Sequence, residues 1–209
     1  MHKCSIFTGG EIKDLSFIDE IAVKKTFVIC ADSGYLYAKR LGIKPDLLIG
    51  DYDSLGYVPY DVENVIRFPS EKDDTDLMLA VKEALKYNCD DIDIYGALGG
   101  RFDHTFSNVQ ALGFLSLHNI NARIISDNDE ITLLNPGKYT FERRENFSLS
   151  LFAYSDIVEG LCIKGTKYPA DNITLTNSFP LGMSNCVTDE KAEISFTTGR
   201  LLAVQSKIN

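Results

Sequence analysis

The chain has 209 residues, of which 30 are acidic and 21 are basic, so its net charge is −9. This length suits one large domain or two small ones, and the 44% hydrophobic and 24% charged residues are typical of a globular protein. The negative charge argues against a broad nucleic-acid-binding face, because such a face neutralises phosphates with lysine and arginine.

The cysteines and the N-terminal residues indicate a reducing compartment. No two of the five cysteines form a Cys-x-x-Cys pair, which argues against a zinc ribbon or a thioredoxin-type redox site. The first ten residues lack the apolar core of a signal peptide, and no uncharged stretch is apolar enough for a bilayer span. We therefore expect a cytoplasmic protein that binds neither nucleic acid nor membrane.

Strand and helix patterns alternate through the first part of the chain. The clearest helix, at 75–87, places its apolar residues at the i, i+3, i+4, i+7 spacing of one buried face, and Asp73 or Asp74 is its expected N-cap. Further helices are expected up to Leu41 and at 103–118. The expected strands are 3–7, 26–30, 47–49, 64–68, 92–95 and 122–126. Such alternation predicts an α/β domain, at 1–126, with a mainly parallel sheet flanked by helices.

After about residue 127 the pattern changes. Segments 147–151, 173–176 and 193–197 alternate with period two, 201–204 is a short strand candidate, and glycine and proline turn signals fall between them. This pattern predicts an all-β domain at 127–209, organised as a β-sandwich.

Four acidic or glycine-rich loops lie in the first domain, where open parallel sheets bind ligands at the carboxyl ends of their strands. They are Ala31-Asp32-Ser33-Gly34, Gly50-Asp51-Tyr52-Asp53-Ser54, Asp73-Asp74-Thr75-Asp76 and the glycine loop with its helix start, Gly96-Ala97-Leu98-Gly99-Gly100-Arg101-Phe102-Asp103-His104. Taken singly, each has a structural explanation: a helix cap, an acidic turn, a surface arginine paired with an acid, or a histidine at a helix start. Their combination favours a shared site.

The chemistry of these loops points to phosphate and a hard cation. Two carboxylates about 4 Å apart repel by roughly 4 kcal/mol at an effective dielectric of 20, so a cluster of these aspartates needs a cation. Oxygen ligands alone select an ion such as Mg²⁺. The glycine loop can offer backbone N–H groups to a phosphate at a helix N-terminus, and Arg101 can bind phosphate oxygens with paired hydrogen bonds. The residues therefore predict Mg²⁺-dependent phosphoryl transfer.

In their order and spacing, the four loops resemble the motifs of the thiamine pyrophosphokinase (thiamine diphosphokinase) family. Met183-Ser184-Asn185 and Ile194-Ser195-Phe196 look like the thiamine-side segments of that family. The resemblance implies an α/β domain followed by a β-sandwich, and transfer of the terminal diphosphate of ATP to the thiamine hydroxyl, which gives thiamine diphosphate and AMP. It also implies a homodimer, with each active cleft built between the α/β domain of one subunit and the β domain of the other.

The resemblance also implies roles for individual residues. The catalytic residues and Mg²⁺ ligands would be Asp51, Asp53, Asp73 and Asp76, with Asp32 in the same cluster. The ATP contacts would be Asp32, Ser33, Gly34, Asp51, Thr75, Gly99, Gly100, Arg101, Asp103 and His104. The β domain would bind thiamine through Ser184, Asn185 and Ser195 and would form the dimer. Independently of the resemblance, the aspartate cluster beside the glycine loop suggests the hypothesis that one aspartate accepts the hydroxyl proton. Some family members stack a tryptophan on the substrate, but this chain has none, so another aromatic must serve here, or none does.

Two alternatives share parts of this pattern. A pyrophosphokinase for another acceptor, such as a hydroxymethylpterin, would share the ATP half and differ in the acceptor pocket, and the Ser184-Asn185 segment favours thiamine. A non-catalytic nucleotide or thiamine sensor would not need every metal ligand. Formation of AMP that depends on Mg²⁺ separates an enzyme from such a sensor.

Overall fold

The computed structural model describes residues 2–53, 56–57, 59–69 and 73–208. Within it the chain divides into two compact units, Met1–Asp127 (unit 1) and Asn128–Asn209 (unit 2). The expected roles of the two parts, ATP and metal binding for the first and thiamine binding and dimerisation for the second, stay predictions. Among the described residues, no helix is long and apolar enough to span a membrane.

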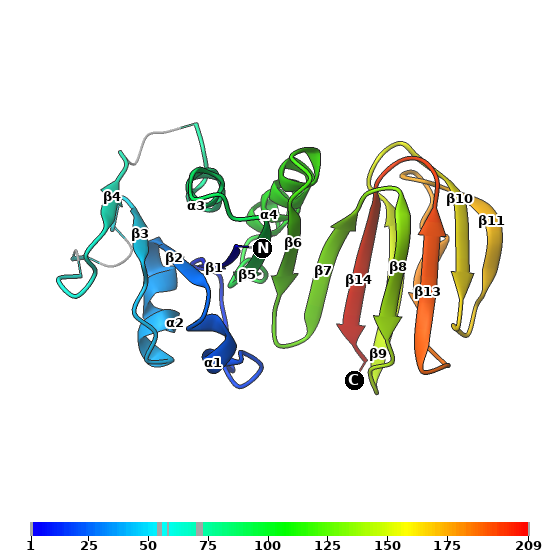
Figure 1. Cartoon of the computed structure of the whole chain (residues 1–209), viewed down its shortest axis with the longest axis horizontal. Helices are drawn as coiled ribbons and strands as arrows, with labels where there is room; N and C mark the ends of the chain where they lie inside the picture. Colours follow the sequence, from blue (N-terminus) through cyan, green and yellow to red (C-terminus); the bar gives the residue numbers. More distant parts are fainter. Residues whose placement is uncertain (1, 54–55, 58, 70–72, 209) are drawn as a thin grey trace. The chain divides into compact units, whose positions relative to one another are not determined.

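Unit 1 is built on a parallel sheet with the strand order β6-β5-β1-β2-β3-β4. Its strands are β1 (Lys3–Phe7), β2 (Phe27–Ala31), β3 (Leu47–Gly50), β4 (Val65–Arg67), β5 (Asp91–Tyr95) and β6 (Asn121–Ile125). Helices α1 (Glu20–Val23) and α2 (Tyr35–Arg40) lie on one side of this sheet, and α3 (Asp76–Lys86) and α4 (Phe102–Leu117) lie on the other (Figure 1). The predicted α/β architecture is confirmed.

The central strands of unit 1 are buried on both faces. Every residue of β3 is buried, and so are the last four residues of β1 and of β2. Phe7 and Cys30 pack with Tyr35 and Ala38 of α2 on one side of the sheet. Because parallel strands with two covered faces appear as continuous apolar runs, these strands were visible in the sequence.

The N-cap of α3 differs from the expected one. Thr75 caps this helix, since its hydroxyl oxygen accepts a hydrogen bond of 3.2 Å from the Met78 N–H. The prediction that Asp73 or Asp74 is the cap was wrong, and Asp74 instead pairs with Lys82 at 2.6 Å. A threonine at the cap leaves Asp76 as the first helical residue, where the carboxylate charge is favourable to the helix dipole.

Unit 2 consists of two antiparallel sheets, with the orders β12-β9-β14-β7 and β11-β10-β13-β8. Its strands are β7 (Asp129–Leu134), β8 (Gly137–Glu142), β9 (Phe147–Ala153), β10 (Ile157–Lys164), β11 (Ala170–Thr176), β12 (Gly182–Asn185), β13 (Lys191–Phe196) and β14 (Leu201–Lys207). One apolar cluster includes Leu151 and Leu201 from the first sheet and Leu161 and Ile194 from the second. The two sheets therefore bury a common core, as expected for a β-sandwich.

Candidate active site

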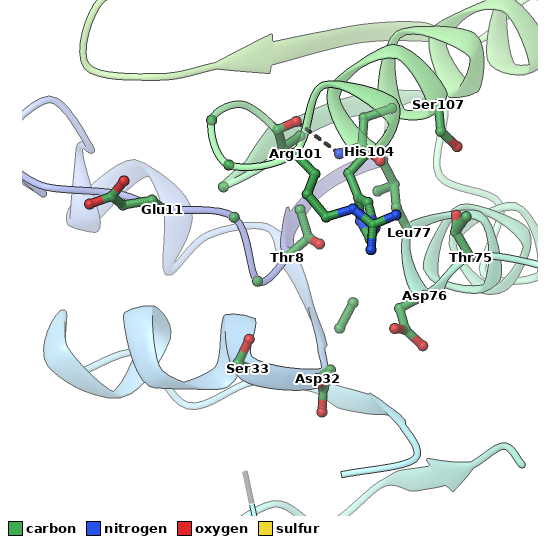
Figure 2. A pocket seen from close by; sticks show the side chains of 18 of the residues that line it. Thr8, Glu11, Asp32, Ser33, Thr75, Asp76, Leu77, Arg101, His104 and Ser107 are labelled. Carbon is green, nitrogen blue, oxygen red and sulfur yellow. Dashed lines mark hydrogen bonds between the residues drawn. The ribbon is translucent and has the colours of Figure 1, made fainter. Parts of the chain in front are cut away.

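A cleft of about 650 Å³ lies in unit 1. It is formed by the loop after β1, the start of the 3-10 turn η1 (Asp32–Gly34) after β2, the start of α3, and the loop between β5 and α4. Its volume is in the range of small-molecule sites. The lining residues are Thr8, Gly9, Gly10, Glu11, Ala31, Asp32, Ser33, Asp74, Thr75, Asp76, Leu77, Gly96, Ala97, Gly99, Gly100, Arg101, Asp103, His104, Ser107 and Asn108 (Figure 2).

Backbone hydrogen bonds join the loop after β1 to the loop after β5. The Thr8 N–H donates to the Tyr95 carbonyl at 2.9 Å, and the Gly10 N–H donates to the Gly96 carbonyl at 2.8 Å. A side chain at Gly10 would collide with that carbonyl, and Gly96 has a φ of +70° with the Thr8 carbonyl against its Cα. Glycine is therefore required at both positions for the loops after β1 and β5 to meet.

Three aspartates from two loops converge at one place. One carboxylate oxygen from each of Asp32, Asp51 and Asp53 lies within 4.8 Å of the other two. Asp32 is only 9% exposed and follows β2, whereas the other two follow β3, and Asp53 is exposed. Asp32 and Tyr52 have φ values of +47° and +65°, which residues other than glycine rarely adopt. Such conformations persist where the surrounding structure enforces them, and they cluster at functional sites.

This set of donors fits a hard divalent cation. The three groups are carboxylates, and their mutual repulsion at this separation is relieved by a positive ion. Asp76 lines the cleft together with Asp32, as Figure 2 shows. Asp73 is exposed, and among the described residues it belongs neither to this cluster nor to the wall of the cleft. Ser54 of the predicted second motif lies outside the described residues.

Arg101 and Asp103 form an ion pair at the start of α4. The Arg101 Nε–H donates to Asp103 Oδ1 at 3.1 Å and the second guanidinium nitrogen donates to Oδ2 at 2.5 Å. These hydrogen bonds hold the pKa of the Asp103 carboxyl below its ordinary value. Both side chains are exposed and both residues line the cleft. A guanidinium has five N–H donors, so Arg101 can keep this pair and still bind phosphate oxygens.

Two side chains of α4 tie the glycine loop to the helix. The Asn108 side-chain N–H donates to the Ala97 carbonyl at 2.8 Å, and the Thr105 hydroxyl donates to the Gly99 carbonyl at 3.5 Å. Gly99 and Gly100 have φ values of +84° and +69°, which favour glycine. The loop therefore presents its backbone beside the N-terminus of α4, the arrangement that binds anions.

Of the other predicted ATP contacts, three line the cleft and one is buried. Ser33, Thr75 and His104 line the cleft, and Thr75 also caps α3. Gly34 is buried, and a side chain there would collide with the Phe7 carbonyl, so its observed role is close packing against β1.

The first segment of the cleft wall was not among the predicted site residues. Thr8, Gly9, Gly10 and Glu11 line the cleft at the end of β1. A glycine-rich loop shortly after a strand is the signal that identified the loop after β5, and Gly9-Gly10, one residue beyond the strand, could have revealed this segment in the same way.

The predicted thiamine-side residues lie in unit 2. Asn185 is buried, and its side-chain N–H groups donate to Thr166 Oγ1 at 3.2 Å and to the Tyr168 carbonyl at 2.8 Å. Its side-chain oxygen accepts hydrogen bonds from the Tyr168 and Cys186 N–H groups, at 3.0 and 2.9 Å. All four hydrogen-bonding positions of the amide are thus engaged within the protein. Ser184 is exposed with a φ of +58°, and Ser195 is half-buried in β13.

Comparison with known proteins gives the same assignment for both units. Residues 18–124 match the family described as thiamin pyrophosphokinase, catalytic domain, and residues 138–201 match the one described as thiamin pyrophosphokinase, vitamin B1 binding domain. The thiamine pyrophosphokinase of Bacillus subtilis (strain 168) is 31% identical over 212 residues, which cover 99% of each chain.

Solved structures of similar proteins agree with this result. The crystal structure of thiamine pyrophosphokinase from Bacillus subtilis has a TM-score of 0.87 to this chain at 31% identity, and covers 99% of this chain and 100% of that one. A thiamin pyrophosphokinase family protein from Enterococcus faecalis has a TM-score of 0.86 at 28% identity, and the match covers both chains completely.

Proposed function

This chain belongs to the thiamine pyrophosphokinase family and has the enzymatic activity of that family, and from this premise we propose where and how it acts. ATP and Mg²⁺ bind in the cleft of unit 1, and the terminal diphosphate of ATP passes to the hydroxyl of thiamine, with AMP as the leaving group. The observation that carries this proposal is the convergence of Asp32, Asp51 and Asp53 beside a cleft that also contains the glycine loop.

The acidic cluster is assigned to the metal. Asp32, Asp51 and Asp53 would hold Mg²⁺, because their three carboxylate oxygens already converge. When bound, the ion neutralises charge on the phosphate oxygens and so favours attack at phosphorus. Asp76 lines the cleft and does not belong to that cluster, so we assign it the hydroxyl proton of the acceptor.

The glycine loop and Arg101 are assigned to the phosphates. Backbone N–H groups of Gly99 and Gly100, next to the N-terminus of α4, bind phosphate oxygens, and the guanidinium adds charged donors. In diphosphate transfer the protein mainly positions the reactants and stabilises developing charge. Hydrogen bonds from Asn108 and Thr105 to the loop support this role, since they hold the donors in place before the nucleotide arrives.

Unit 2 is assigned to thiamine. The match of residues 138–201 to a vitamin B1 binding domain supports thiamine as the acceptor rather than a hydroxymethylpterin. Ser184 and Ser195 are the residues we assign to substrate contact. Asn185 holds the 166–168 segment through its amide, so its contribution to thiamine binding is the position of that segment.

The direct test is a product analysis with the purified protein, ATP, Mg²⁺ and thiamine. Chromatography should find AMP and thiamine diphosphate in equal amounts, and neither product without Mg²⁺. ADP with thiamine monophosphate would instead contradict attack at the β-phosphorus. Nucleotide binding without AMP formation with either acceptor, thiamine or a hydroxymethylpterin, would mean a sensor rather than an enzyme.

We further propose a homodimer in which unit 1 of one subunit and unit 2 of the other complete each cleft. Light scattering should give twice the mass of the chain. Asp51→Asn disables unit 1 of its subunit, and Ser184→Arg disables unit 2 of its subunit. When the two variants are unfolded and refolded together, each hybrid dimer therefore has one intact cleft and one cleft with both substitutions. With half of the dimers hybrid, activity should recover to about a quarter of the wild-type level. No recovery from hybrids that demonstrably form would exclude a shared cleft.

A further inference from the structure

One phenol fixes both peptide groups that flank Glu11. The Tyr37 hydroxyl donates a hydrogen bond of 2.8 Å to the Gly10 carbonyl and accepts one of 3.1 Å from the Ile12 N–H. Tyr37 belongs to α2 and packs, partly buried, against the apolar core of unit 1. The backbone on both sides of Glu11 is therefore held to a well-packed side chain.

The glycine loop borders the same segment. The Gly10 N–H bonds to the Gly96 carbonyl at 2.8 Å. A Cβ placed on Gly99 would lie 3.8 Å from the Glu11 carbonyl oxygen and 3.9 Å from the Glu11 Cβ, which is ordinary van der Waals contact. Glu11 thus lies directly against the loop that we assign to phosphate binding.

The Glu11 carboxylate is exposed and lines the cleft. Figure 2 shows it at one side of the cleft, while Asp32 and Asp76 lie at the other. Among the described residues it has no hydrogen-bond or ion-pair partner. An ionised carboxylate only accepts hydrogen bonds, so a ligand group that binds it must be a donor. A phosphate cannot meet that requirement.

From this placement we infer that Glu11 accepts hydrogen bonds from the 2′- and 3′-hydroxyls of the bound nucleotide and so selects ribonucleotides. The inference rests on the proposed binding of ATP in this cleft. The ribose is the first group after the α-phosphate that carries donors, and Glu11 lies against the phosphate loop. Two adjacent hydroxyls match the two oxygens of a carboxylate, and in dinucleotide-binding sites a carboxylate hydrogen-bonds the ribose 2′-hydroxyl. Tyr37 acts as a positioning residue for Glu11.

The test compares kcat/KM for ATP, 2′-deoxy-ATP and 3′-deoxy-ATP in the wild type, Glu11→Gln and Glu11→Ala. The wild type should prefer ATP to either deoxynucleotide by about tenfold or more, the worth of a hydrogen bond to a charged group. In Glu11→Ala this preference should fall close to one, with an intermediate value in Glu11→Gln. Glu20→Gln, an exposed charge change on α1 away from the cleft, should keep the wild-type ratio.

Tyr37→Phe keeps the ring and removes the hydroxyl that holds Glu11. It should lower the ribose preference severalfold and leave the KM for thiamine unchanged, which a general loss of folding would not do. An unchanged ribose preference in both Tyr37→Phe and Glu11→Ala would overturn the inference.

Binding of AMP and 2′-deoxy-AMP, followed by calorimetry, gives a readout that does not depend on turnover. The difference in affinity between them should be present in the wild type and lost in Glu11→Ala. If Glu11→Ala instead alters the preference for ATP over inosine triphosphate and leaves the deoxy ratio intact, Glu11 faces the base and the ribose assignment is wrong. If the wild type forms thiamine diphosphate and Glu11→Ala keeps the wild-type preference for ATP over the deoxynucleotides, only the role of Glu11 is refuted. If the wild type forms no thiamine diphosphate, the proposed function itself is refuted.

Discussion

Gly50 lies against the backbone of Asp32: a Cβ atom at position 50 would be 3.3 Å from both the Cα and the Cβ of Asp32. Gly50 ends β3 and Asp32 follows β2, and these two strands are neighbours in the parallel sheet. The absence of a side chain at Gly50 therefore lets the loop that carries Asp51 and Asp53 approach Asp32. The metal site that we propose depends on this contact.

Gly50→Ala should accordingly weaken Mg²⁺ binding. The added methyl group forces the two loops apart by a few tenths of an ångström, so the Mg²⁺ concentration that gives half-maximal activity (the apparent Mg²⁺ constant) should rise about tenfold. The overpacking should also lower the free energy of unfolding by roughly 1–3 kcal/mol. Gly42→Ala is the matched control, because Gly42 has a φ of +63° but nothing within 4 Å of a Cβ. It should lower stability by about 1 kcal/mol without altering the Mg²⁺ dependence. Equal Mg²⁺ constants in the two variants would contradict the prediction.

Asp51→Asn and Asp53→Asn should each lower kcat by orders of magnitude while the protein stays folded. Removal of one charge from the cluster reduces repulsion among the three carboxylates, so thermal unfolding should occur at the same temperature or slightly higher. Steady-state kinetics over a range of Mg²⁺ concentrations, with melting curves, checks both statements. Asp127→Asn, an exposed charge change outside the cleft, is the control. Wild-type turnover in both cluster variants would exclude these residues as metal ligands.

Arg101→Ala should raise the KM for ATP by about tenfold or more, because charged donors to the phosphates are lost. The ion pair with Asp103 is exposed on both sides, so its loss should leave the melting temperature nearly unchanged. Arg101→Lys keeps the charge but not the paired donors and should restore only part of the affinity. If Arg101 serves only to pair with Asp103, Arg101→Ala and Asp103→Asn will instead have the same small effect on KM.

The Tyr35–Asp61 contact should make stability depend on pH. The buried Tyr35 hydroxyl donates to both carboxylate oxygens of Asp61, at 2.8 and 2.9 Å, and this bond holds the Asp61 pKa below its ordinary value of 3.8. A pKa lowered by folding stabilises the protein above the unfolded pKa, and this contribution is lost as the pH falls through the folded value. Tyr35→Phe should therefore be less stable than the wild type at pH 7, and the gap should narrow below about pH 4.

Urea unfolding of both proteins between pH 3 and pH 7 measures that gap. Tyr60→Phe, in which the altered side chain is almost fully exposed, should follow the wild type throughout. A gap of constant size over the whole range would mean that the hydroxyl acts by packing alone.

Most of the α/β unit could be predicted because local sequence and tertiary burial agree there. β3 consists of the expected run at 47–49 and one further residue, and α3 is one residue shorter at each end than the helix expected at 75–87. By contrast, β8 at 137–142 is an edge strand whose exposure alternates between half-buried and exposed. Its regular structure comes from pairing with β13, about fifty residues later in the chain. The local sequence around 137–142 contains no signal of that pairing. The four-residue helix α1 is too short for a helical period to appear.

The candidate site follows the same rule. Asp32, Asp51 and Asp53 were predictable because each follows a strand closely, so the parallel sheet brings them to one edge. Glu11 was not, because its place at the cleft depends on Tyr37, 26 residues further on, and on loop contacts with Gly96 and Gly99. The structural role of Asn185 was hidden likewise, since its partners are 17 and 19 residues earlier.

Asn185 and Ser184 should therefore separate stability from substrate binding, although they are neighbours. Asn185→Ala removes a buried amide that bonds both the N–H and the carbonyl of Tyr168, and should lower the free energy of unfolding by roughly 1–3 kcal/mol. Ser184→Gly removes an exposed hydroxyl at a φ of +58°, which glycine adopts without strain, so stability should be kept while the KM for thiamine rises severalfold. Urea unfolding and thiamine titrations of both variants measure the two effects. An unchanged KM in Ser184→Gly would remove this residue from the thiamine site, and full stability in Asn185→Ala would mean that its amide is not what holds the 166–168 segment.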